Sequence, residues 1–149
     1  MAGFFAVASQ HQCVSDLFFG TDYHSHLGTQ RGGMAVLGDG PIRRVIHDIT
    51  NTQFRSKFDD DLPKFQGRYG IGVISDSDDQ PVLLRSHLGT YAIATVGAIT
   101  NLAQLTEHLL KERRVHFAEV ADGGVSPTEL AGMLINQEDT FAAGIEHAQ

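Results

Sequence analysis

The order of hydrophobic patterns along the chain constrains its fold more than any other sequence feature. Up to residue 96, apolar residues gather in runs of strand length, at Gly3–Ser9, Met34–Leu37, Ile42–Ile49, Gly70–Ser75, Val82–Ser86 and Tyr91–Val96. The main exception is Cys13–Leu27, where they recur at helical spacing. Beyond residue 100 the helical spacing dominates. Strands in succession, followed by helices, predict an α+β fold rather than a parallel sheet of βαβ units.

The second half of the chain carries clear helix-start signals. Asn101 can cap a helix with a leucine-rich face, and Gln104 lies at its capping-box position. The segment 126–129 reads Ser-Pro-Thr-Glu, which combines a cap, a proline at the first helical position and a glutamate three residues after the cap. A last helix is expected from Asp139 to the end of the chain.

The remaining segments give weaker expectations. Gly3–Ser9 is apolar without alternation, which predicts a strand buried on both faces. Phe58–Pro63 is expected to form a short helical turn, and the acidic segment 76–79 a solvated hairpin loop. Val115–Val120 is expected to be a strand, followed by a loop over 121–124.

Composition limits the partners and the compartment. Eleven Lys and Arg against eighteen Asp and Glu give a net charge of −7, which disfavours nucleic acid or an anionic membrane as a partner. No apolar run is long enough to span a bilayer, and no basic segment precedes the first apolar residues as in a signal peptide. The lone cysteine, Cys13, fits a reducing compartment. We therefore expect a cytoplasmic protein in which residues 1–149 form one domain.

Several glycine-containing segments together carry a family resemblance. They are Gly3 near the chain start, then 28–35 (Gly-Thr-Gln-Arg-Gly-Gly-Met-Ala), 67–73 (Gly-Arg-Tyr-Gly-Ile-Gly-Val) and 96–101 (Val-Gly-Ala-Ile-Thr-Asn). In order and spacing the chain resembles the glutamine amidotransferase domain of amidophosphoribosyltransferase, a class II domain of the N-terminal-nucleophile family. The resemblance implies a four-layer αββα sandwich. Family domains continue beyond the point that matches residue 149, so we expect an N-terminal portion of a longer protein whose sheets are incomplete at the C-terminus.

The resemblance fails at the positions where that family performs its chemistry. Ala2 stands where the family has its nucleophilic cysteine, and Val96 stands where an asparagine donates to the oxyanion. Ser75 replaces the arginine that pairs with the glutamine carboxylate, and Pro127 replaces the aspartate that holds the substrate's amino group. The family's catalytic set is therefore expected to be absent, and glutaminase activity is not expected.

Two family positions keep their residue types, Arg31 and Gly97, and we expect them to line a remnant ligand pocket. The resemblance then implies a catalytically silent domain of an amidophosphoribosyltransferase-like protein, of the purine nucleotide biosynthesis family, with a structural or regulatory role. It would dock on a synthase or phosphoribosyltransferase domain and self-associate, without cofactor or metal. Two alternatives stay open: an enzyme that uses the pocket for another substrate, with Arg31 as an anion anchor, or a pure protein-interaction module.

Other constellations favour ordinary structural roles. Asp22, His24 and His26 alternate, but at a helix end steps of two residues separate side chains, so surface polar residues are favoured over a metal site. Cys13 lies beyond the first strand and is expected to be inert or partly buried rather than a substitute nucleophile. The acidic runs lack the ligand spacing of a calcium loop. Glycines 70 and 72 lie within a strand, where they permit close packing rather than phosphate binding.

Overall fold

The computed structural model describes residues 2–26, 30–112, 115–118, 120–121 and 124–149. Within these residues the strands are β1 (Gly3–Ala8), β2 (Arg31–Leu37), β3 (Arg43–Asp48), β4 (Tyr69–Ser75), β5 (Val82–Ser86), β6 (Gly89–Ile93), β7 (Val120–Ala121) and β8 (Gly124–Val125). The helices are α1 (Val14–Tyr23), α2 (Phe54–Phe58), the short 3-10 helix η1 (Leu62–Lys64), α3 (Leu102–Lys111), α4 (Pro127–Ile135) and α5 (Phe141–Ala148). The predicted α+β class is confirmed.

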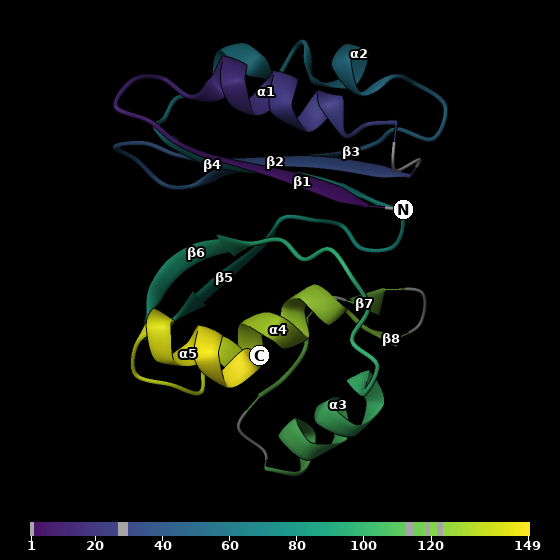
Figure 1. The fold of residues 1–149 in the computed structure, drawn as a ribbon, viewed down its shortest axis with the longest axis vertical. Coiled ribbons are helices and arrows are strands. Elements are labelled where there is room, and N and C mark those ends of the chain that lie inside the picture. The colour runs from purple at the N-terminus through teal and green to yellow at the C-terminus, as the bar shows by residue number, and fades with distance from the viewer. Residues whose placement is uncertain (1, 27–29, 113–114, 119, 122–123) are drawn as a thin grey trace.

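Four strands form the main sheet, in the order β1-β4-β2-β3, and every neighbouring pair is antiparallel. We call it sheet A. Helices α1 and α2 cover one of its faces, whereas the β5–β6 hairpin lies on the side of the other face (Figure 1). Helices α4 and α5 lie beyond that hairpin, and α3 lies farthest from sheet A.

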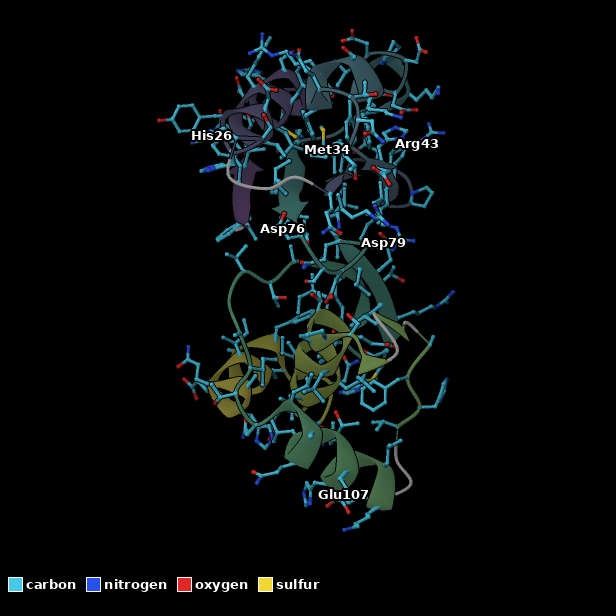
Figure 2. The ribbon with its side chains drawn as sticks, turned by 90° about the vertical axis from the view of Figure 1, so that its right-hand side faces the viewer. His26, Met34, Arg43, Asp76, Asp79 and Glu107 are labelled. Atoms are coloured by element: carbon cyan, nitrogen blue, oxygen red, sulfur yellow. The ribbon has the colours of Figure 1, made fainter. Side chains whose placement is uncertain are left out.

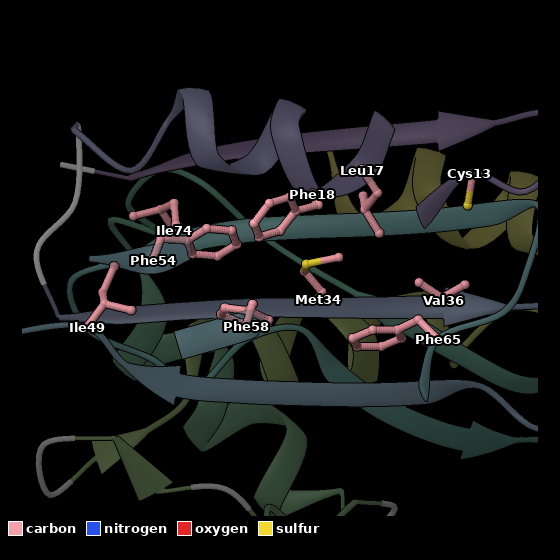
Figure 3. Close-up of a cluster of buried hydrophobic side chains, with 10 residues drawn as sticks. All are labelled: Cys13, Leu17, Phe18, Met34, Val36, Ile49, Phe54, Phe58, Phe65 and Ile74. Carbon is pink, nitrogen blue, oxygen red and sulfur yellow. The ribbon is translucent and has the colours of Figure 1, made fainter. Parts of the chain in front are cut away.

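The largest hydrophobic core lies between sheet A and the helices α1 and α2 (Figure 3). Phe54 stacks on Phe58 with ring centroids 4.4 Å apart, and Leu17 and Met34 are fully buried beside them. Because burying such side chains contributes about 1.5 to 3 kcal/mol each, this core fixes α1 and α2 against sheet A. It thereby holds the strand ends in place.

Two glycines of β4 allow α1 to approach the sheet closely. A Cβ placed on Gly72 would lie 1.9 Å from the Thr21 hydroxyl oxygen, and one on Gly70 would lie 2.6 Å from a methyl carbon of Leu17. At position 72 a larger residue would have to displace Thr21, and at position 70 it would have to displace the end of the Leu17 side chain. The expectation that glycines 70 and 72 serve close packing is therefore confirmed.

A third glycine brings the segment after β4 against the opposite face of sheet A. A Cβ on Gly33 would lie 1.7 Å from the carbonyl oxygen of Gln80 and 2.8 Å from the Pro81 ring. Arg44 of β3 donates a hydrogen bond to the Pro81 carbonyl over 3.1 Å. The chain path into β5 is thus set by direct contact with sheet A.

Two expectations about burial and connection were wrong. β1 is not buried on both faces, because its residues alternate and Phe4 is 57% exposed. The acidic segment 76–79 is not a solvated hairpin loop. It crosses from β4 in sheet A to β5 in a different sheet, and Asp78 within it is only 3% exposed.

Local expectations in the second half had mixed outcomes. Ser126 caps α4 as predicted, with its hydroxyl accepting from the Glu129 amide over 3.2 Å. Asn101 makes no capping hydrogen bond at the start of α3. Residues 115–118 are not a strand, and β6 ends at Ile93 rather than Val96. Part of the predicted loop over 121–124 lies outside the described residues, as do Leu27 and residues 28–29 of the first glycine-rich segment.

Helix length also bears on membranes. Among the described helices, none combines the length and the apolar character that crossing a bilayer requires.

Candidate functional site at one end of sheet A

Three of the residues singled out by sequence meet at one end of sheet A. Arg31 at the start of β2 pairs with Ser75 at the end of β4. Ala2 immediately precedes Gly3, which pairs with Ile74, the neighbour of Ser75. The antiparallel register therefore places Ala2, Ser75 and Arg31 next to one another on adjacent strands, although they are far apart in the sequence.

Ser75 shapes the segment that leaves this end of the sheet. Its side chain is buried, with 2% of the residue exposed, and its hydroxyl accepts hydrogen bonds from the Ser77 amide over 3.3 Å and the Asp78 amide over 3.2 Å. A serine that bonds to amides two and three residues ahead stabilises a turn. The backbone of 75–78 is therefore held by the side chain at its start, and Asp78 is turned inward.

Asp78 connects this turn to the start of α4. One carboxylate oxygen, Oδ2, accepts from the Ser126 hydroxyl over 3.0 Å and from the Thr128 hydroxyl over 3.2 Å. The other, Oδ1, is buried without a hydrogen-bond partner. A carboxylate is stabilised at a helix N-terminus by the exposed amide dipoles. Figure 2 shows the neighbouring Asp76 and Asp79 between sheet A above and the β5–β6 and helical part below.

The remaining residues singled out by sequence border the same segment. Pro127 lies between Ser126 and Thr128, the two residues that donate to Asp78. The Thr128 hydroxyl lies 2.6 Å from that of Thr95, and the Thr95 amide donates to the side chain of Gln80 over 2.8 Å. Thr95 is followed by Val96 and Gly97. Hydrogen bonds thus join the surroundings of Ser75, Pro127 and Val96 into one buried polar network.

Val96 and Gly97 face open space beside this network. Val96 is 45% exposed, and a Cβ on Gly97 would meet nothing within 4 Å. Gly97 has a φ of +139°, a backbone conformation that other residues rarely adopt. Position 97 therefore favours glycine because of its backbone conformation and not because of a lack of space.

Arg31 already has two carboxylate partners. Its Nη1 lies 2.8 Å from Asp48 Oδ2, and its Nε lies 2.9 Å from Asp79 Oδ1. Hydrogen bonds from Thr50 hold the pKa of Asp48 below its usual range, and Arg31 lowers it further. An anionic ligand at Arg31 would have to compete with both carboxylates.

His24 packs against Gly3 near the start of the chain. The sequence did not indicate this position of the histidine. A Cβ on Gly3 would lie 2.9 Å from the His24 Cβ, so the histidine packs directly against the residue after Ala2. Its Nδ1 is buried and has no hydrogen-bond partner. Asp22 instead pairs with Arg55 over 2.7 Å. Within the described residues no group of three or more His, Cys, Asp or Glu side chains is arranged to hold a metal.

Cys13 lies away from this site. Its amide donates to the Gly67 carbonyl, near the beginning of β4 rather than its end. The side chain is fully buried, and burial raises the pKa of its thiol. The expectation of a buried cysteine is confirmed, and a neutral thiol in this place is a poor nucleophile.

The hydroxyls of Ser75, Ser126 and Thr128 at this end of sheet A all form structural hydrogen bonds. Those of Ser126 and Thr128 donate to Asp78, and that of Ser75 accepts from backbone amides. In the described part of the chain, none of the three is hydrogen-bonded to a histidine that would activate it as a nucleophile. The arrangement holds a loop in place and offers no recognisable acyl-transfer set.

Comparisons with known proteins show the fold. The chain is similar to the solved structure of glutamine phosphoribosylpyrophosphate amidotransferase from B. subtilis complexed with ADP and GMP, with a TM-score of 0.82 and 20% identity. It is equally similar to a structure described as the allosteric regulatory enzyme of purine biosynthesis, with a TM-score of 0.81 and 20% identity. Each match covers 99% of this chain but 32% of the solved chain, so this chain spans about a third of their length. No family model and no curated protein matches the sequence.

Proposed function

We propose that this chain is a glutamine amidotransferase-like domain that does not hydrolyse glutamine and that has a structural or regulatory role in an amidophosphoribosyltransferase-like protein. The proposal is carried by the geometry at one end of sheet A. There Ala2 lies beside Ser75, and Asp78, in the segment that follows Ser75, is hydrogen-bonded to the start of α4. The similarity to glutamine phosphoribosylpyrophosphate amidotransferase supports the choice of family.

The layers of the molecule support an N-terminal-nucleophile architecture. From top to bottom in Figure 1, α1 and α2, sheet A, the β5–β6 hairpin, and α4 with α5 follow one another. We propose that these are the four layers of an αββα sandwich whose second sheet is narrow. Such a sandwich would present its reaction centre at the chain start, where this sequence has a methyl group.

A glutaminase assay tests the proposal. The chain with Ala2 and the variant Ala2→Cys are incubated with glutamine, and ammonia release is measured after mass spectrometry has established removal of the initiator methionine. We expect no hydrolysis by either, because a restored thiol would still lack the side chains that position glutamine. Cys13→Ala in the Ala2→Cys background is the matched control for the second thiol. Hydrolysis by the chain with Ala2 would overturn the proposal of catalytic silence, and hydrolysis by Ala2→Cys would overturn the proposal that the side chains that position glutamine are absent.

An interaction role has support of its own in an apolar face. Phe4, Leu37 and Tyr69 lie on the face of sheet A that points away from α1, and they are 57%, 40% and 52% exposed. A cavity of about 180 Å³ separates part of this face from β6. Exposed apolar groups of this kind mark contact surfaces. We propose that the part of this face that β5 and β6 leave uncovered contacts a synthase or phosphoribosyltransferase domain, or a second copy of the chain. Light scattering tests the second possibility, which a monomer at high protein concentration would contradict.

A further inference from the structure

A larger cavity lies at the opposite end of sheet A. It is formed where β2 ends and β4 begins, and its volume is about 880 Å³. The turn over 38–42, the first residues of β3 and the segment 64–68 line it, and Leu83 of β5 forms one side. β2 has seven residues, so a rise of about 3.3 Å per residue places this cavity about 20 Å from Arg31.

This cavity concentrates positive charge in an acidic protein. Arg43, Arg44, Lys64 and Arg68 all line it, whereas Asp39 is its only carboxylate within the described residues. The whole chain carries a net charge of −7. The sequence gives little sign of this cluster because the cations come from two segments, 43–44 and 64–68, that the fold brings together. We call these four residues the basic pocket.

Two of the arginines are held without being neutralised. Arg43 donates from Nη1 to the carbonyl of Lys64 over 2.7 Å, and Arg44 donates from Nη1 to the carbonyl of Pro81 over 3.1 Å. A carbonyl fixes the orientation of a guanidinium but does not cancel its charge. Each guanidinium has five N–H donors, so most of them stay available to a ligand.

The other two cations have partners that an anion can displace. Lys64 lies 2.8 Å from Asp61, with its own side chain 53% exposed. Arg68 lies 3.9 Å from Asp39, whose side chain is fully exposed. Both cations are 53% exposed and their ion pairs are therefore screened by solvent, although the Asp61 side chain itself is only 13% exposed. The basic pocket therefore keeps a net attraction for anions.

We propose that the basic pocket binds a small phosphorylated molecule. A single guanidinium matches two oxygens of a phosphate by parallel hydrogen bonds, and Arg43 and Arg44 present theirs from the two faces of the edge strand β3. The cavity is much larger than a bare phosphate and falls within the range of about 300 to 1,000 Å³ typical of small-molecule sites. Ile42, Pro41 and Leu83 provide an apolar side for the organic part of such a ligand. A long polyanion is disfavoured because the rest of the surface carries excess negative charge and would repel it.

Calorimetric titration with inorganic pyrophosphate tests this inference on the intact chain at low ionic strength. We expect saturable binding of one pyrophosphate per chain, weakened about tenfold or more in Arg43→Gln/Arg44→Gln through loss of charge-assisted hydrogen bonds. Arg43→Lys/Arg44→Lys should recover only part of the loss, because lysine keeps the charge without the planar fork. Arg85→Gln is the matched control: Arg85 is an exposed arginine of β5 outside the cavity. Circular dichroism checks that each variant is folded.

Three outcomes would overturn the inference. One is the absence of saturable pyrophosphate binding in the millimolar range. Another is an equal loss in Arg85→Gln, which would indicate only a general attraction between charges. The third is displacement of pyrophosphate by a short single-stranded RNA that binds more tightly, which would point to nucleic acid instead. The glutaminase assay does not touch this pocket, so the two proposals can fail separately.

Discussion

The arginines at the two ends of sheet A have different partners, although the same strands form both ends. At the end where β2 begins, Arg31 is paired with the carboxylates of Asp48 and Asp79. At the end where β2 stops, Arg43 and Arg44 are bonded to backbone carbonyls and keep their charge. The partner of a cation, and not its presence, therefore decides whether a strand end can attract a ligand. The charge of Arg31 is balanced by carboxylates of the protein itself, whereas Arg43 and Arg44 can still attract an anion.

Removal of Asp78, at the end where β2 begins, should lower the stability of the protein more than any other substitution proposed below. Asp78→Ala takes away the acceptor of two buried hydroxyls, and we expect the free energy of unfolding to fall by about 3 kcal/mol, since hydrogen bonds to charged groups contribute about 1.5 to 3 kcal/mol each. Urea denaturation measures it. Asp79→Ala is the matched control, because the Asp79 side chain is 62% exposed and its pair with Arg31 should contribute less than about 1 kcal/mol. Equal effects of the two substitutions would mean that the buried network does not stabilise this end.

A substitution in the middle of the sheet should have a smaller effect. Gly72→Ala places a methyl group against Thr21, and overpacking of this kind costs about 2 kcal/mol. Gly40→Ala, in the turn beside the basic pocket, has no atom within 4 Å of the new Cβ and should leave stability nearly unchanged. Thermal unfolding of the two variants makes the comparison. A stable Gly72→Ala would contradict the close approach of α1 to β4.

The basic end should also respond to acid. Lys64 and then His47 lower the pKa of Asp61 in the folded protein. A lowered pKa stabilises the fold above the ordinary aspartate pKa of about 4, and this stabilisation is lost as the pH falls below that value through the folded pKa. We expect a loss under about 1 kcal/mol, since Lys64 is exposed. Unfolding measured between neutral and acidic pH should show a shallower pH dependence in Asp61→Asn than in the natural chain. Identical slopes for the two chains would argue against the contacts of Asp61 with Lys64 and His47.

The smallest expected effect is a change in the pKa of Asp48, which lies beside Arg31 at the end where β2 begins. Hydrogen bonds from Thr50 contribute more to its lowered pKa than Arg31 does. Thr50→Val removes only the side-chain hydrogen bond and leaves the amide that donates to Asp48 Oδ1 over 2.8 Å. We therefore expect it to raise the pKa of Asp48 partway toward the ordinary value, which NMR titration of the carboxyl carbon measures. An unchanged pKa would mean that the ion pair with Arg31 dominates at this exposed position.

Local signals in the sequence predicted much of the fold. The Ser-Pro-Thr-Glu start of α4 and the strand Val82–Ser86 appear as expected, because caps and short apolar runs act within a few residues. Asn101 failed as a cap, although its residue type suits that role. β1 was misjudged because its outer face carries Phe4 and alanines, which look buried in the sequence whether or not another layer covers them.

The candidate site was less accessible from the sequence. Ala2, Ser75 and Arg31 were chosen by resemblance, and only the strand register shows that they are neighbours. Asp78 was assigned to a solvated loop because acidic residues between strands usually face water. Its burial depends on Ser126 and Thr128, about fifty residues away, and no local pattern encodes such a pairing. The assignment of Val96 and Pro127 to lost catalytic positions stays a prediction.

The contact between Gly33 and the Gln80 carbonyl has a consequence for how this sequence tolerates change. Every amino acid other than glycine carries a Cβ, and at position 33 that atom would overlap a main-chain oxygen. A main-chain atom cannot rotate away as a side chain can. In a library that samples all residues at each glycine, position 33 should accept glycine alone, while position 40 should accept almost any residue. Measured side by side, the two positions would show whether the segment that enters β5 keeps its path against sheet A in living cells.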